Sequence, residues 1–331
     1  MELRVLGRTR HRVSRLGLGL AALGRPGYIN VGHAEDLDRC YDVELMRERT
    51  HAVLDAAWVA GVRYFDAARS YGRAEEFLAS WLAKRGIVSA AVTVGSKWGY
   101  TYTAGWRTEA EHHEVKDHSL AVLERQIGES RAVLGTHLDL YQIHSATLES
   151  GVLENPAVLG SLAQLRRQGL SIGLSVSGPR QAETLRLAMQ VAVDGQALFD
   201  CVQATWNLLE RSAGDALAEA HRAGMGVIIK EGLANGRLTA RYNDRAFDAK
   251  RDRLRAVAAE LGVSVDGLAL AAILAQPWVD VVLSGAATVE HLASNLSALR
   301  VVWNEAVSRE LEPLIETPTE YWSSRGRLPW N

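Results

Sequence analysis

The sequence has 331 residues, of which 47% are hydrophobic and 23% charged, with two cysteines and a formal net charge of -2. This apolar fraction excludes a disordered chain, and two cysteines are too few to hold together a disulfide-built secreted fold. A nucleic-acid surface is not expected, because phosphate binding requires clustered positive charge.

The beginning of the chain carries charges throughout and lacks the uninterrupted apolar core of a signal peptide. No stretch reaches the ~20 apolar residues that a membrane helix requires. We therefore expect a soluble, cytoplasmic protein with neither a membrane nor a nucleic acid as partner.

Short apolar runs rich in β-branched residues alternate with longer amphipathic runs along the whole chain. The predicted strands are Val13–Gly19, Arg63–Asp66, Ala91–Ser96, Leu138–His144, Ser171–Ser175, Val202–Thr205, Gly226–Ile229 and Asp280–Ser284. The predicted helices are Met46–Ala60, Arg73–Lys84, Lys116–Leu134, Ala157–Arg167, Arg180–Met189, Asp215–Ala223, Arg251–Gln276 and Val289–Ala298. Continuous apolar strands are typical of a parallel sheet covered by helices. Eight strand–helix units predict an α/β fold, a (β/α)8 TIM barrel, as a single domain over residues 1–331.

Two departures from the plain barrel are expected. A strand–helix unit needs ~30 residues, and the excess length follows strands 1, 3 and 7, which predicts long loops on the face where active sites form. Before the first strand, Leu3–Leu6 and Arg12–Ser14 are separated by Gly7, Arg8 and Thr9 and predict a short N-terminal hairpin.

Four polar residues stand where predicted strands end. Asp66 ends the second strand, with Tyr71 in the loop after it, Lys97 follows the third strand and His144 ends the fourth. A lysine ammonium beside a phenol favours the phenolate and brings its pKa toward the working range, while an aspartate balances the buried ammonium. Such a set, with a histidine to bind a substrate oxygen, protonates a carbonyl. It supplies no electrons, so a hydride-carrying cofactor is needed.

At this point the sequence resembles the aldo-keto reductase superfamily over nearly its whole length. The resemblance rests on Leu3–Thr9, Val13–Gly19, Asp66–Gly72, Lys97, Asp139–His144, Ser284–Ala286 and Glu290–Leu296. It implies a NAD(P)-dependent oxidoreductase in which Tyr71 is the general acid/base. The substrate implied is a small carbonyl or alcohol, sugar-like ones included.

The resemblance also implies cofactor contacts. Ser175 and Gln203 match residues that hold the nicotinamide carboxamide. Lys230 replaces a stacking aromatic; it can pair with a pyrophosphate or an acidic substrate, or form an ion pair with Glu231. Other expected cofactor contacts are Gly285, Ala286, His291 and Asn295. The resemblance favours NADP(H), because most members of the superfamily use it. NAD(H) is the alternative, because the basic residues that usually bind the 2′-phosphate are weakly represented.

Aromatic residues in the long loops suggest a wall for the substrate. The expected substrate contacts are Trp98, Tyr28 and Trp106. No metal site is expected: His113 and His118 are five residues apart and cannot face one ion from a helix, so this segment is predicted to be a solvated loop or helix start.

The sequence leaves two properties of the protein open. One is the oligomeric state, monomer or homo-oligomer. The other is an alternative function, a cofactor-binding, redox-sensing regulatory subunit with slow turnover, as the potassium-channel β subunits of this superfamily are.

Overall fold

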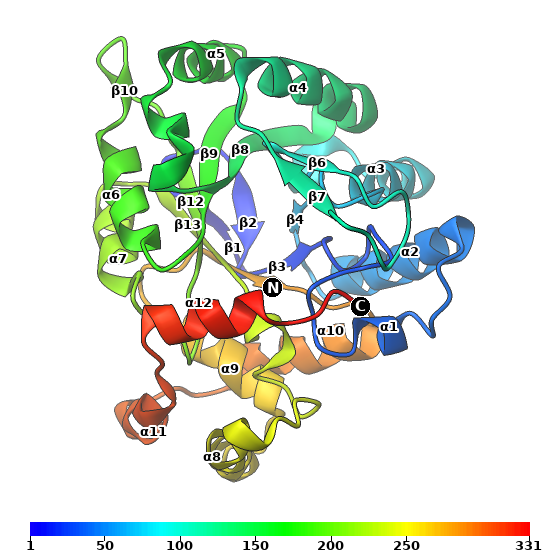
Figure 1. Cartoon of the computed structure of the whole chain (residues 1–331), viewed down its shortest axis with the longest axis vertical. Helices are drawn as coiled ribbons and strands as arrows, with labels where there is room; N and C mark the ends of the chain where they lie inside the picture. The colour runs from blue at the N-terminus through cyan, green and yellow to red at the C-terminus, as the bar shows by residue number, and fades with distance from the viewer.

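The computed structural model describes all 331 residues, and its centre is a closed barrel of eight parallel strands (Figure 1). The barrel strands are β3 (Leu16–Gly19), β4 (Tyr64–Asp66), β5 (Thr93–Trp98), β8 (Leu138–Ala146), β9 (Ser171–Val176), β12 (Cys201–Thr205), β13 (Gly226–Lys230) and β14 (Val281–Ser284). They pair in chain order, and β14 pairs with β3 to close the ring. The predicted (β/α)8 barrel is confirmed, because each predicted strand overlaps an observed one.

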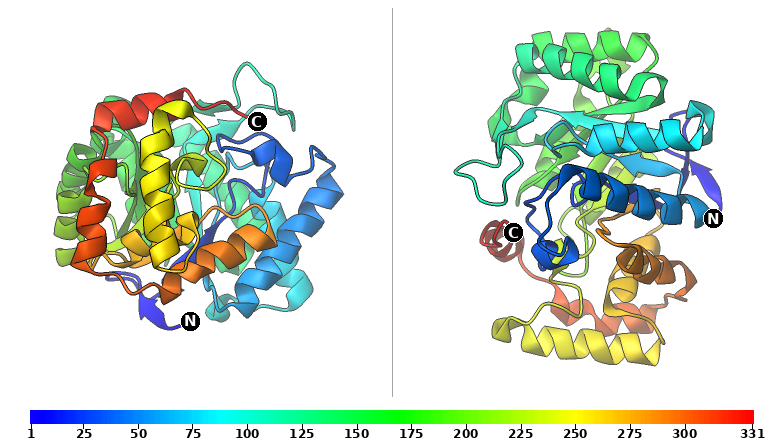
Figure 2. Two further views of the ribbon diagram at one scale, coloured as in Figure 1. Left: turned by 90° about the horizontal axis from the view of Figure 1, so that it is seen from below. Right: turned by 90° about the vertical axis from the view of Figure 1, so that its right-hand side faces the viewer.

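Helices surround the barrel (Figures 1 and 2). They are α1 (His33–Asp36), α2 (Val43–Val59), α3 (Ala74–Arg85), α4 (Leu120–Leu134), α5 (Pro156–Arg167), α6 (Gln181–Gln190), α7 (Gly214–Arg222), α8 (Asp248–Glu260), α9 (Val265–Leu274) and α10 (Val289–Leu296). The single helix predicted over Arg251–Gln276 is wrong. The chain breaks at Gly262, which has a φ of 63°, and Ser264 caps the new helix α9.

The predicted N-terminal hairpin is present as β1 (Leu3–Val5) and β2 (Arg12–Ser14), paired antiparallel. Leu6 in its turn is fully buried and packs in a cluster with Val13 and Tyr64. The hairpin thus covers the bottom of the barrel, at the end where the strands begin (Figure 2). It also explains why the predicted strand Val13–Gly19 is divided: its first part pairs in the hairpin and its second part in the barrel.

The opposite face, where the strands end, carries the long loops and the C-terminal segment. Further elements there and at the edges are β6 (Tyr100–Tyr102), β7 (Glu114–Lys116), β10 (Ala192–Val193), β11 (Gln196–Ala197), α11 (Glu305–Glu310) and α12 (Pro318–Gly326). Because β7 pairs with β6, the helix predicted from Lys116 begins only at Leu120. Helix α12 crosses this face, and the last residue, Asn331, exchanges two backbone hydrogen bonds with Tyr28 (Figure 1).

No single helix is long and apolar enough to cross a membrane. Only the pair 245–260 and 265–274 meets the length and composition criteria together, and its two parts are bent by 81°.

Candidate active site

The carboxyl ends of three neighbouring barrel strands bring the predicted catalytic residues together. Lys97, the next-to-last residue of β5, is 1% exposed and donates through Nζ to the Tyr71 hydroxyl at 3.3 Å and to the Ala67 carbonyl at 3.0 Å. Its ammonium also forms an ion pair with Asp66, the last residue of β4. His144, on β8, packs edge to face on Tyr71 with 5.5 Å between ring centroids. Four residues predicted separately therefore form one cluster.

Asp66 is held by three further donors. Its Oδ1 accepts hydrogen bonds from the Tyr64 hydroxyl at 3.2 Å, from Gln142 Nε2 at 3.3 Å and from Gln203 Nε2 at 2.9 Å. A buried carboxylate is tolerated only when its acceptor sites are filled in this way. The amide nitrogen of Gln203, predicted to bind a cofactor, thus already has a partner inside the barrel.

The pKa values in this cluster differ from the sequence-based expectation in one respect. Burial raises the pKa of Tyr71 well above its usual 10.0, Asp66 raises it further, and Arg25 lowers it. The expected lowering by Lys97 is not found in this arrangement, because removing the phenol from water disfavours the phenolate more. Burial, with Lys97 and Lys230 nearby, lowers the pKa of His144 well below 6.5. At neutral pH the site therefore holds a protonated phenol and a neutral imidazole.

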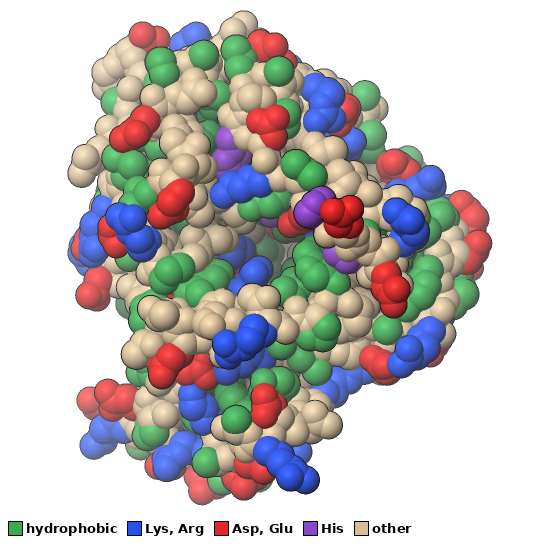
Figure 3. Space-filling view, viewed as in Figure 1, with side chains coloured by type: hydrophobic (Ala, Val, Ile, Leu, Met, Phe, Trp, Pro, Cys, Tyr) green, Lys and Arg blue, Asp and Glu red, His purple; other side chains and the backbone are tan.

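A cavity of about 590 Å³ opens in front of these residues. Figure 3 shows it as a hollow in the face that carries the strand ends, with Lys or Arg side chains inside. One wall is the segment after β13 and another is the segment after β14. Of the predicted site residues, those that line the cavity are Asp66, Tyr71, His144, Gln203, Lys230, Gly285, Ala286, His291, Asn295 and Tyr28.

Three predicted contacts lie elsewhere. Trp98 is fully buried in the main core. Neighbouring residues on a strand face opposite sides, and the Lys97 side chain points to the inside of the barrel, so Trp98 points away from it. Trp106 donates to the Tyr41 carbonyl at 2.6 Å and anchors its loop to the connection before α2. The Ser175 hydroxyl is buried and accepts from the backbone nitrogen of Ser145 at 2.8 Å. None of the three lines the cavity.

Lys230 forms the ion pair with Glu231 that was one of the two expected alternatives, and its Nζ also donates to the hydroxyls of Thr205 at 2.8 Å and Ser177 at 3.3 Å. Its Nζ lies 3.8 Å from Glu231, which Arg325 of α12 binds with two nitrogens. Burial lowers the pKa of Lys230 to about 8 although Glu231 opposes this. Burial raises the pKa of Glu231, but Arg325 and Lys230 outweigh it and hold the value at about 2. Three charged groups thus stand in the cavity wall.

Sequence reasoning missed the second polar wall. Arg25 is 2% exposed, donates through Nη1 to the Ser70 carbonyl at 2.9 Å and to Glu114 at 2.8 Å, and its Nε has no partner. The guanidinium also lies over the rings of Trp330, at 4.8 Å, and Tyr28, at 5.2 Å. Tyr28 is one of the predicted substrate contacts, but no local pattern marks Arg25 and Glu114, which come from the first loop and the β6–β7 hairpin.

The segment 113–118, expected to be a solvated loop or helix start, is exposed at residues 115–117, and its residues 114–116 form strand β7. The His113 ring stacks on Trp330 with 4.2 Å between centroids and an angle of 7° between the planes. The prediction is wrong at His113, which is buried, because Trp330, the residue that covers its ring, is more than 200 positions away in the sequence.

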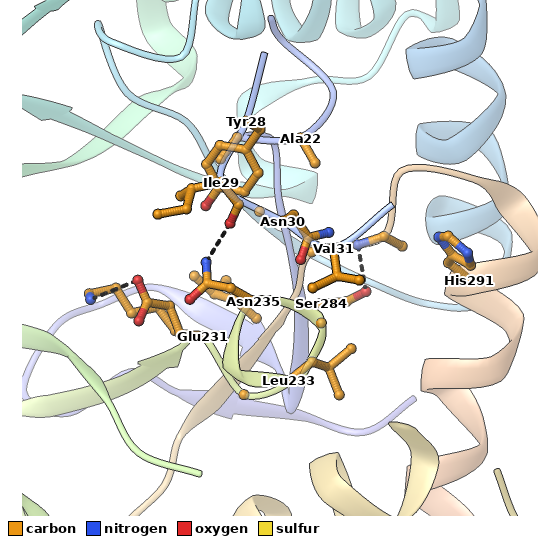
Figure 4. A pocket seen from close by; sticks show the side chains of 18 of the residues that line it. Ala22, Tyr28, Ile29, Asn30, Val31, Glu231, Leu233, Asn235, Ser284 and His291 are labelled. Atoms are coloured by element: carbon orange, nitrogen blue, oxygen red, sulfur yellow. Dashed lines mark hydrogen bonds and ion pairs between the residues drawn. The ribbon is translucent and has the colours of Figure 1, made fainter. Parts of the chain in front are cut away.

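The loops after β3 and β13 meet across the middle of the cavity (Figure 4). Asn235 donates through Nδ2 to the Ile29 carbonyl at 2.9 Å, and the backbone nitrogen of Val31 donates to the Asn235 carbonyl at 3.0 Å. The Asn235 Oδ1 is buried without a partner. These contacts, together with a φ of 55° at Asn235, fix the shape of the two loops where they meet over the cavity. We call residues 29–31 and Asn235 the strap.

Comparison with known proteins agrees with this geometry. The sequence profile described as "Aldo/keto reductase family" matches residues 15–316. Pyridoxal 4-dehydrogenase of Microbacterium luteolum is 27% identical, over 98% of this chain and 96% of its own. The uncharacterized oxidoreductase YrpG of Bacillus subtilis is 25% identical, over 97% and 99%. The structure of aldo-keto reductase AKR11C1 from Bacillus halodurans superposes with a TM-score of 0.72 at 20% identity, over 96% and 97%. The chain therefore belongs to the aldo/keto reductase family of oxidoreductases.

Proposed function

We propose that this chain is a NAD(P)-dependent oxidoreductase that interconverts an aldehyde or ketone and the corresponding alcohol, with Tyr71 as general acid and base. The observation that carries the proposal is the Tyr71 hydroxyl in the cavity wall, 3.3 Å from the ammonium of Lys97. A phenol in this position can protonate a carbonyl oxygen, and the phenolate that remains is stabilised by the adjacent cation.

Each neighbour has a distinct role in this proposal. Lys97 donates to the phenol oxygen, which leaves the phenol's own hydrogen free to point into the cavity. Asp66 neutralises Lys97 and fixes its position. The neutral imidazole of His144 binds the substrate oxygen beside Tyr71 and so orients the carbonyl for proton transfer.

The cavity fits a nicotinamide dinucleotide, which supplies the hydride that these side chains lack. Its volume lies in the range of cofactor sites, and its walls offer polar atoms along their length. At Gly285 an added Cβ would meet nothing within 4 Å, and the Asn235 Oδ1 at the strap still needs a donor. Gln203 and Lys230 would hold the end near Tyr71, and Asn295 the other end.

The substrate class that fits best is a small aldehyde or ketone with additional hydroxyl groups, such as a sugar. Two charged clusters, Arg25–Glu114 and Lys230–Glu231–Arg325, line the cavity and provide donors and acceptors for hydroxyls. Aromatic rings beside them suit the apolar face of such a molecule. Pyridoxal, a hydroxylated aromatic aldehyde, is a further compound to test, because one relative is named pyridoxal 4-dehydrogenase.

A panel of sugars, simple aldehydes, ketones and pyridoxal with each reduced cofactor, and of the alcohols with each oxidised one, tests the proposal. We expect substrate-dependent change of absorbance at the reduced-nicotinamide band with at least one compound. Tight dinucleotide binding without any turnover would contradict the enzyme and support the regulatory alternative.

The rate of carbonyl reduction should be independent of pH between about pH 6 and about pH 7, below the range in which Lys230, with a pKa of about 8, loses its charge. The His144 pKa is lowered, so the ring stays neutral well below pH 6.5, and the Tyr71 pKa is raised, so the phenol keeps its proton past pH 10. The check is kcat/KM across buffers of constant ionic strength. A break near pH 6.5 would show that His144 titrates normally and contradict the assigned protonation states.

Replacing Arg25 by Met should weaken binding of hydroxylated substrates selectively. We expect KM for glyceraldehyde to rise about tenfold and kcat to change less than about threefold, because loss of uniform binding raises KM alone. Propanal, with the same carbon chain and no hydroxyls, should be nearly unaffected. Arg73→Met is the matched control, since Arg73 is half exposed and lies over Trp106, outside the cavity. An equal rise for both aldehydes would contradict the role of Arg25 in specificity.

A further inference from the structure

Two aspartates line the cavity in addition to the charged groups already described. Asp36, at the end of α1, lines the cavity with a side chain that is 2% exposed. Asp266, in the first turn of α9, lines it too. The only Lys or Arg side chain that contacts Asp36 is Arg241, whose Nη2 lies 2.5 Å from Asp36 Oδ1, and His291 Nε2 is 3.7 Å from the same oxygen.

The Asp36 carboxylate still has acceptor capacity. The Arg241 guanidinium is paired with Oδ1, whereas Oδ2 of the same carboxylate accepts no hydrogen bond from the protein. A carboxylate oxygen in the cavity wall that lacks a donor can accept a hydrogen bond from a ligand hydroxyl. Arg241, in turn, is already neutralised by Asp36.

The part of a bound dinucleotide that would lie beside Asp36 follows from the chemistry at Tyr71. Hydride transfer requires the nicotinamide beside Tyr71, and Glu231 lies close enough to Tyr71 to raise its pKa. Figure 4 shows Glu231 and His291 on opposite sides of the pocket, with the strap residues Asn30, Val31 and Asn235 between them. An extended dinucleotide that begins at Tyr71 therefore places its adenosine half at His291 and Asp36.

On these grounds we propose that Asp36 makes this protein selective for NAD(H) over NADP(H), by accepting a hydrogen bond from the adenosine ribose and repelling a 2′-phosphate. The two cofactors differ only in that phosphate, which carries close to two negative charges and three strong acceptor oxygens. It would meet the Asp36 carboxylate directly, in a cavity that Asp266 also lines, and a guanidinium that Asp36 already occupies. A hydroxyl, by contrast, fills the open acceptor site of Asp36.

This inference rests on the proposed function, since it takes the cavity to hold a nicotinamide dinucleotide. It departs from the family habit that favours NADP(H) in the sequence-based expectation. The difference comes from α1, a segment of the first long loop, whose Asp36 carboxylate lies beside His291, where the resemblance implied contacts only from the segment after β14.

The test is binding rather than turnover: titration of the full-length protein with NADH and with NADPH, followed by quenching of tryptophan fluorescence. We expect NADH to bind at least about tenfold more tightly, and Asp36→Asn to reverse or abolish this preference by at least about tenfold in the ratio of dissociation constants. The gain should be mainly in NADPH affinity, because Arg241 is then free to pair with the phosphate.

Asp38→Asn is the matched control. Asp38 lies two residues further, pairs with Arg49 and has a side chain that is 79% exposed outside the cavity, so its removal should leave the ratio unchanged. Asp36→Ser, which also removes the charge, guards against a local effect of the new amide. Equal or tighter NADPH binding by the unaltered protein, or an unchanged ratio in both Asp36 variants, would overturn the inference while the proposed function stands. Binding of neither dinucleotide would overturn the proposed function itself.

Discussion

Replacing Tyr71 by Phe should lower kcat for carbonyl reduction by about 10²–10⁴-fold while dinucleotide binding stays within about twofold of the unaltered protein. The substitution removes only the hydroxyl, which accepts one hydrogen bond from Lys97 and otherwise faces the cavity. The ring remains to pack on His144, so the shape of the site is kept. Steady-state kinetics for the reduction and fluorescence titration for the cofactor give the two readouts.

Tyr242→Phe is the control for loss of a tyrosine hydroxyl. The Tyr242 hydroxyl bonds Asp244 and does not line the cavity, so this variant should keep full activity. A Tyr71→Phe protein that turns over at more than about a tenth of the original rate would remove Tyr71 from the proton-transfer step. Loss of cofactor binding in the same variant would show that the hydroxyl serves the cavity rather than the reaction.

Replacing Lys97 by Met should affect both activity and stability. The ammonium is the one cation beside Asp66, and both side chains are at most 2% exposed, so its removal leaves a buried carboxylate without a counterion. Breaking a buried pair in this way costs about 3–5 kcal/mol of unfolding free energy. The chemical step should slow by about 10²-fold or more, because no cation stabilises the Tyr71 phenolate. Urea unfolding and single-turnover kinetics measure the two effects.

Adding Asp66→Asn to Lys97→Met separates the two effects. An asparagine oxygen can still accept from Tyr64, Gln142 and Gln203, while the unpaired charge is gone. We expect the double variant to regain most of the lost stability and none of the lost rate. If activity returned together with stability, the slow rate of Lys97→Met would reflect a damaged fold, and Lys97 would have no direct part in proton transfer.

Where prediction from sequence succeeded, the signal was local. Asp66, Lys97 and His144 stand at or next to the ends of continuous apolar runs, and parallel barrel strands bring all such ends to one face. It failed for Trp98, next to Lys97, because periodicity gives alternation along a strand but not which side is the cavity. The tail helix α12 was also missed, since the aromatic residues around it show no clear amphipathic pattern.

The sequence by itself determined the barrel, the hairpin beneath it and the cluster around Tyr71, because hydrophobic periodicity and strand ends are properties of neighbouring residues. Only the tertiary structure decided what surrounds that cluster. Arg25 meets Glu114, Asp36 meets Arg241, and Tyr28 meets Asn331, so each wall of the cavity joins residues from distant parts of the chain. Loop residues carry no period, and their positions follow from long-range ion pairs and backbone hydrogen bonds that form only when the barrel has closed.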